Sequence, residues 1–142
     1  MGRRLKHYGV QTAGVTQIAT TGNTDEYVIV PKSGTLAAAF FTSLAGLTAH
    51  DSNYITFGIT NLGAAAGGST ALLAASDANT TKATGGTGLT ANASRSLTVH
   101  GTAANLAVTE GDVLRIRFAA TGTLAGAVTR PVVSLLIAAN GQ

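Results

Sequence analysis

Hydrophobic and polar residues alternate with a period of two in several short stretches of the chain. In residues 54–60, Ile55, Phe57 and Ile59 fall on one side of an extended segment, and polar or small residues fall on the other. This pattern is typical of a β-strand with one face in a core and the other in water or against a neighbour.

A second stretch indicates whether the strands of the sheet are parallel or antiparallel. Leu114, Ile116 and Phe118 alternate with Arg115 and Arg117. Since the arginines cannot be buried on a second covered face, the pattern favours an antiparallel sheet over the parallel kind that helices cover on both sides.

Short β-rich runs of this kind recur along the chain, and Gly, Pro, Asn or Asp residues bound each of them. Helix-length periodic segments are missing. The spacing is typical of a sandwich or a barrel, with strands expected at 15–20, 26–30, 35–44, 54–60, 71–75, 95–100, 113–120 and 132–138.

The composition supports one domain with an unusual surface. Of the 142 residues, 45% are hydrophobic but only 5% are aromatic, so the core must consist largely of small and β-branched side chains. Only 11% are charged, whereas the surface of a free monomer is commonly about 25–35% charged. We therefore expect much of the surface to face other protein, and we predict a homo-oligomer, with a trimer as the expected assembly.

Charge divides the chain into an N-terminal basic arm, residues 1–13, and a single β domain, residues 14–142. The net charge is +3, and Arg3, Arg4 and Lys6 account for it, because the rest of the chain is neutral. A protein that binds a nucleic-acid duplex usually spreads several phosphate contacts over one face, so we expect no direct nucleic-acid partner.

Two readings of the arm stay open. It is either a frayed terminus or a segment that orders on binding, with Leu5 and Tyr8 as apolar anchors among the charges. The second reading is our prediction.

Candidate chemistry is sparse. The chain has no Cys, its three His residues lie far apart in the sequence, and no nucleophile elbow, phosphate-binding loop or calcium loop fits. The stretches 63–69 and 76–90 are low-complexity loops, which we interpret as surface loops, with ordering against a neighbouring subunit as the alternative. We expect no enzyme, no metal and no cofactor.

We expect neither a secretory signal nor a membrane helix in this chain. No apolar h-region follows the basic start, and no run reaches the roughly 18 apolar residues of a membrane helix. The expectation is a soluble protein, made in a host cytoplasm, with no membrane partner.

Three strand-and-turn motifs resemble β-sandwich proteins of tailed-phage virions. They are LTAHDSNYITF at 47–57 with TNLG at 60–63, VPKSGTL at 30–36 and VTEGDVLR at 108–115. With the final strand they cover most of positions 26–138. The overall form resembles bacteriophage capsid decoration, or head-stabilising, proteins.

That resemblance implies a fold and a role. The fold would be an all-β, antiparallel eight-stranded β-sandwich of jelly-roll type. The role would be a structural virion protein that sits on the capsid exterior, commonly as a homotrimer, and clamps the major capsid protein through an N-terminal arm. By position, the residues that map to the capsid-binding arm are Arg3, Arg4, Leu5, Lys6 and Tyr8, and the family implies no catalytic residues.

Two other functions remain open. A carbohydrate- or receptor-binding module of a phage tail fibre is weakened by the absence of Trp, because sugar platforms usually rely on exposed aromatic rings. A small viral coat protein with an RNA-binding arm is weakened because the arm has only three basic residues.

Overall fold

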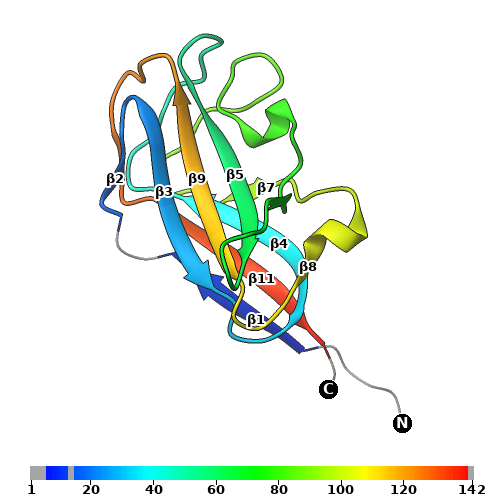
Figure 1. Cartoon of the computed structure of the whole chain (residues 1–142). Helices are drawn as coiled ribbons and strands as arrows, with labels where there is room; N and C mark the ends of the chain where they lie inside the picture. Colours follow the sequence, from blue (N-terminus) through cyan, green and yellow to red (C-terminus); the bar gives the residue numbers. More distant parts are fainter. Residues whose placement is uncertain (1–5, 13–14, 141–142) are drawn as a thin grey trace.

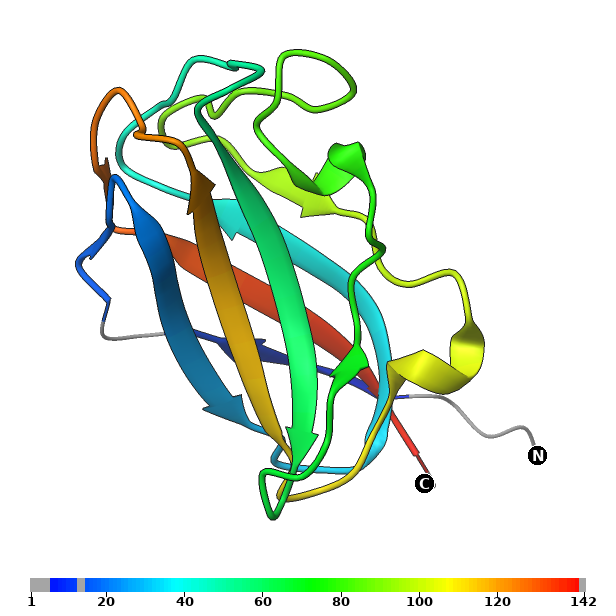
Figure 2. The same cartoon turned by 45° about the horizontal axis from the view of Figure 1, so that its top comes forward.

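The computed structural model describes residues 6–12 and 15–140. Strands dominate it, and they stack face to face in two main sheets (Figures 1 and 2). Within the described residues the helical content is two short 3₁₀ segments, η1 (Asp77–Asn79) and η2 (Ala103–Leu106).

The first sheet, here called sheet I, runs in the order β1 (Lys6–Gln11), β11 (Val132–Ala139), β4 (Gly34–Thr42) and β7 (Arg95–Leu97). A short strand, β8 (Ala107–Val108), pairs with the start of β4. The second, sheet II, runs in the order β3 (Gly22–Ile29), β9 (Val113–Thr121), β5 (Tyr54–Gly63) and β6 (Thr70–Ala71). A separate two-strand ribbon joins β2 (Gln17–Ile18) to β10 (Val128–Thr129).

The chain passes between the sheets in a regular order. Of the eight main strands, β1, β4, β7 and β11 belong to sheet I, and β3, β5, β6 and β9 belong to sheet II. All pairings between described strands are antiparallel. This order is the double Greek key of a jelly roll, so the predicted all-β, antiparallel sandwich is confirmed.

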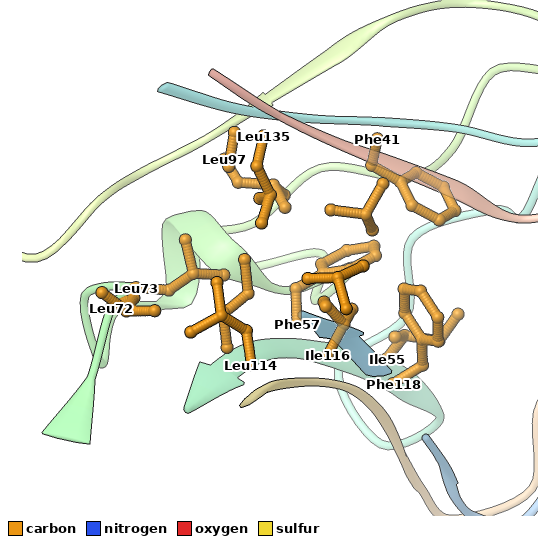
Figure 3. Packing of buried hydrophobic residues seen from close by; sticks show 14 of the residues in the cluster. Phe41, Ile55, Phe57, Leu72, Leu73, Leu97, Leu114, Ile116, Phe118 and Leu135 are labelled. Carbon is orange, nitrogen blue, oxygen red and sulfur yellow. The ribbon is translucent and has the colours of Figure 1, made fainter. Parts of the chain in front are cut away.

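Alternation along the long strands builds the core. The inward side chains of β5, β9, β4 and β11 are almost completely buried. Three of the chain's four phenylalanines, Phe41, Phe57 and Phe118, meet between the sheets, with ring centroids 4.9 to 5.9 Å apart (Figure 3). Their tilted and edge-to-face contacts are the favoured geometries for aromatic pairs.

The start of the fold differs from the prediction. The expectation that no strand begins before Val15 is wrong, because β1 pairs with β11 along its whole length. The strand expected at 15–20 is reduced to β2, which pairs only with β10. β1 was missed because it is an edge strand on which only Tyr8 and Val10 are even half-buried, so its alternation is weak.

A comparison of two adjacent residues tests the register of β4. Phe41 is 2% exposed, whereas Phe40, on the opposite face of the sheet, is 36% exposed. We expect Phe41→Ala to lower the free energy of unfolding by about 3–5 kcal/mol and Phe40→Ala by about 1 kcal/mol or less, measured by urea unfolding. Equal losses would contradict the register, because a slip by one residue exchanges the two faces.

Candidate interaction surfaces

The structure places part of the predicted arm in the sandwich. Lys6 and Tyr8 lie in β1, while Arg3, Arg4 and Leu5 lie outside the described residues. Lys6 is exposed at the start of the strand.

Tyr8 is a residue of the fold. Its half-buried ring packs against the core, and its hydroxyl donates a hydrogen bond to the Lys32 carbonyl in the connection between β3 and β4. Partial burial raises the pKa of the Tyr8 phenol. Tyr8 therefore ties β1 to the connection between β3 and β4. These contacts leave less of the Tyr8 surface available to a partner than the sequence suggests.

The outward face of sheet I carries no full charge. In its described strands the outward positions hold no Asp, Glu, Lys or Arg, and His7 is the one titratable residue among them. Leu136 and Phe40 are the large apolar side chains of this face, 37% and 36% exposed. The remaining outward positions are Gly9, Gln11, Thr35, Ala37, Ala38, Thr42, Ser96, Ala107, Val132, Ser134 and Ala138.

The outward face of sheet II is different. Arg117 on β9 faces Asp25 on β3, and its Nε and Nη2 donate to the two carboxylate oxygens at 2.8 and 2.9 Å. These hydrogen bonds lower the pKa of Asp25 and raise that of Arg117. Beside the pair, Tyr27 and Ile29 are 58% and 67% exposed.

The loop at 76–90 is held by Arg95, which points inward from β7. Its guanidinium donates to the carbonyls of Thr87, Ala78 and Thr80 at 2.5, 3.0 and 2.6 Å, and it lies 5.1 Å from the centre of the Phe57 ring. Burial lowers the pKa of the Arg95 guanidinium. No motif in the sequence indicates these contacts, because Arg95 lies in a stretch that reads as an ordinary strand.

A buried amide ties the same loop to the chain beyond β7. Asn79 is 1% exposed; its Nδ2 donates to the Ala74 and Thr98 carbonyls at 2.9 and 2.8 Å, and its Oδ1 accepts from the Thr98 N–H at 2.7 Å. At the loop's outer end, Asp51 accepts from the Thr84 N–H at 2.7 Å, which lowers the pKa of the Asp51 carboxyl. The loop is therefore fastened by the domain itself, an arrangement that neither sequence interpretation anticipated.

Two of the three histidines accept hydrogen bonds that stabilise turns. His50 Nδ1 accepts from the N–H groups of Ser52 and Asn53, and His100 Nδ1 accepts from the Thr102 N–H. His7 lies exposed on β1. Among the residues that the structure describes, no three metal-ligating side chains come together.

An open depression of about 400 Å³ lies beside β5, where the chain after β6 leaves the sheet. Gly58 forms part of its floor, and Tyr54 and Asp77 line it. Lys82 Nζ lies 3.4 Å from Asp77 Oδ1 and 5.4 Å from the centre of the Tyr54 ring. The carboxylate and the aromatic ring that could bind a sugar are thus engaged within the chain.

In the described part of the chain, no helix has the length and apolar character needed to cross a membrane. The chain matches no family model, no curated protein and no solved structure. Its candidate surfaces must therefore be interpreted from their own geometry.

Replacing Arg95 tests whether this side chain holds the loop. We expect Arg95→Ala to lower the free energy of unfolding by about 2–3 kcal/mol, because three carbonyls lose a charged donor. The exposed Lys32→Ala should change it by less than about 0.5 kcal/mol. We also expect faster amide hydrogen exchange at 76–90 in Arg95→Ala and not in Lys32→Ala. Equal stability of the two variants would contradict the role of Arg95 in holding the loop.

The Asp25–Arg117 pair predicts a pH dependence. A carboxyl whose pKa is lowered by folding stabilises the native state above its unfolded pKa, near 3.8, and this contribution is lost as pH falls through the lower folded value. Asp25→Asn should therefore be less stable than the native chain by about 0.5–1 kcal/mol at pH 7 and nearly equal at pH 2.5. Urea unfolding at the two pH values measures this, and a difference that persists at pH 2.5 would assign the loss to another cause.

Proposed function

We propose that this protein is a non-enzymatic structural protein that decorates the outside of a bacteriophage capsid as an oligomer and stabilises the shell. The observation that carries the proposal is the outward face of sheet I, which has no full charge at its described positions. The jelly-roll sandwich and the resemblance of three motifs to virion proteins support it.

An uncharged sheet face suits permanent attachment. Burying a charge costs free energy unless a partner compensates for it, and this face carries none to bury. Its Leu136 and Phe40 side chains supply apolar area, and burial of such area contributes about 25 cal/mol per Å². The small residues around them let another protein approach closely.

The basic arm supplies a second contact in this proposal. Lys6 is the first residue of β1, and Arg3 and Arg4 lie three and two residues before it in the sequence. Together with Leu5, these residues would dock on an acidic groove of the major capsid protein. Tyr8, which the fold already holds, would help only through its exposed part.

Co-sedimentation with undecorated shells of the phage that encodes the chain tests the face. We expect Leu136→Glu to weaken binding at least tenfold, because a carboxylate would be buried against the shell. Thr56→Glu, on the outward side of sheet II, is the matched control and should bind as the native chain does. Equal binding by both variants would exclude the sheet I face.

The arm is tested in the same assay. Deleting residues 2–5 leaves β1 intact, whereas a deletion through residue 8 would remove half of that strand. Changing Arg3, Arg4 and Lys6 to Ala should weaken binding at low salt and matter less at high salt, because exposed charge pairs are screened. Failure of the native chain to bind shells, with binding in a glycan array or RNA copurification instead, would favour the tail-fibre or coat-protein alternative.

A further inference from the structure

The outer edge of β1 carries backbone hydrogen-bonding groups that could pair with a further strand. β1 is the terminal strand of sheet I and pairs on one side with β11. The N–H of Thr12, which directly follows β1, donates to the Val133 carbonyl at 3.0 Å. Because backbone groups alternate in direction along an antiparallel ladder, the N–H and C=O groups of His7, Gly9 and Gln11 point away from β11.

The other sheet ends in the described chain are short strands or have a neighbouring segment along part of their length. β6 and β7 are two and three residues long. Along β3, the chain from Val15 to Ala19 lies beside the strand, with the Val15 and Ala19 N–H groups donating to the side chains of Glu26 and Thr24 (Figure 1).

Among the described residues, β1 has no such protection along its outer edge. It has no Pro, its six pairs with β11 run in continuous register without a bulge, and its one full charge is Lys6 at the end. Natural proteins usually protect an edge strand with a proline, a bulge or charged residues, because an unprotected edge can pair with a further strand.

We propose that two copies of this chain pair through β1, antiparallel, across a twofold axis at Gly9. The proposal rests on the oligomeric part of the proposed function and names its interface. Gly9 would exchange two backbone hydrogen bonds with Gly9 of the second copy, and His7 would pair with Gln11 of the second copy at both ends. Three N–H groups from each copy would then be satisfied, and the two copies of sheet I would form one continuous sheet.

The strand's own sequence fits this register. Lys6 falls opposite Thr12 of the second copy, so no like charges face each other. Tyr8 falls opposite Val10, which places two half-buried apolar side chains side by side on the inward face.

The pairing also joins the two uncharged outward faces of sheet I. His7, Gly9 and Gln11 lie on that face, so the joined surface would run unbroken across the axis. The assembly is a dimer, which departs from the trimer implied by the resemblance to decoration proteins.

Two substitutions at one position test the proposal. The Gly9 N–H points to the open edge, so Gly9→Pro removes no bond to β11 and the monomer should stay folded, whereas the central bonds of the dimer are lost. Gly9→Ala keeps the N–H, and the added Cβ would meet its nearest atom, the Leu135 carbonyl oxygen, at an ordinary 3.9 Å. At micromolar concentration, light scattering should give the mass of two chains for the native protein and Gly9→Ala, and of one chain for Gly9→Pro.

A crosslink tests the register directly. The native chain has no Cys, so a disulfide in Gly9→Cys can join only the two copies at this position. Hydrogen-bonded antiparallel partners lie about 5.5 Å apart between Cα atoms, within the span of a disulfide. Mild oxidation should convert most Gly9→Cys chains to covalent dimers, while Ser96→Cys, on β7 at the far edge of sheet I, should stay mostly uncrosslinked.

Each outcome has a distinct meaning. A native chain with the mass of one or three copies, a dimeric Gly9→Pro, or equal crosslinking of both Cys variants would overturn the β1 pairing. These measurements need no shells. A dimer that fails to co-sediment with shells would therefore overturn the capsid proposal and leave the pairing intact.

Discussion

The contact of Phe41, Phe57 and Phe118 between the two sheets is the constraint on which this structure depends. The chain has no Trp and few aromatic residues, so these three rings are the largest apolar side chains in the buried core. They come from one strand of sheet I and two of sheet II, and bringing them together fixes the face that each strand turns inward. The inward residues also determine which residues face outward, because neighbouring residues on a strand point to opposite faces.

The same alternation separates two kinds of exterior. On β9 it turns Arg115 and Arg117 outward, so sheet II presents charge and an ion pair with Asp25. On β4 and β11 it turns small, hydroxylated and apolar residues outward. Apart from Arg95, which points inward from β7, the charged residues of the described chain lie on sheet II, in the loops and at Lys6 at the start of β1. The low content of charged residues in the chain thus corresponds to an uncharged outward face on sheet I.

The sequence predicted the strands whose alternation is strong and missed those held by neighbours. β5, β9 and β11 were placed within a few residues because their apolar positions repeat every second residue. The sequence of β1 has no repeat of this strength. This strand is held in place by its pairing with β11 and by the Tyr8 hydroxyl. The anchoring of the loop by Arg95 and Asn79 could not be foreseen either, because it joins a side chain to carbonyls that only the folded chain brings near.

The position of β1 connects these features to assembly. A free edge and an uncharged face each expose a protein to association, and proteins that act alone usually protect against both. Here the two adjoin, since the outward residues of β1 belong to the face as well as to the edge. A strand added at this edge extends the face without introducing a charge into it. A single interaction between copies would therefore satisfy the backbone of β1 and widen the surface available to a larger partner.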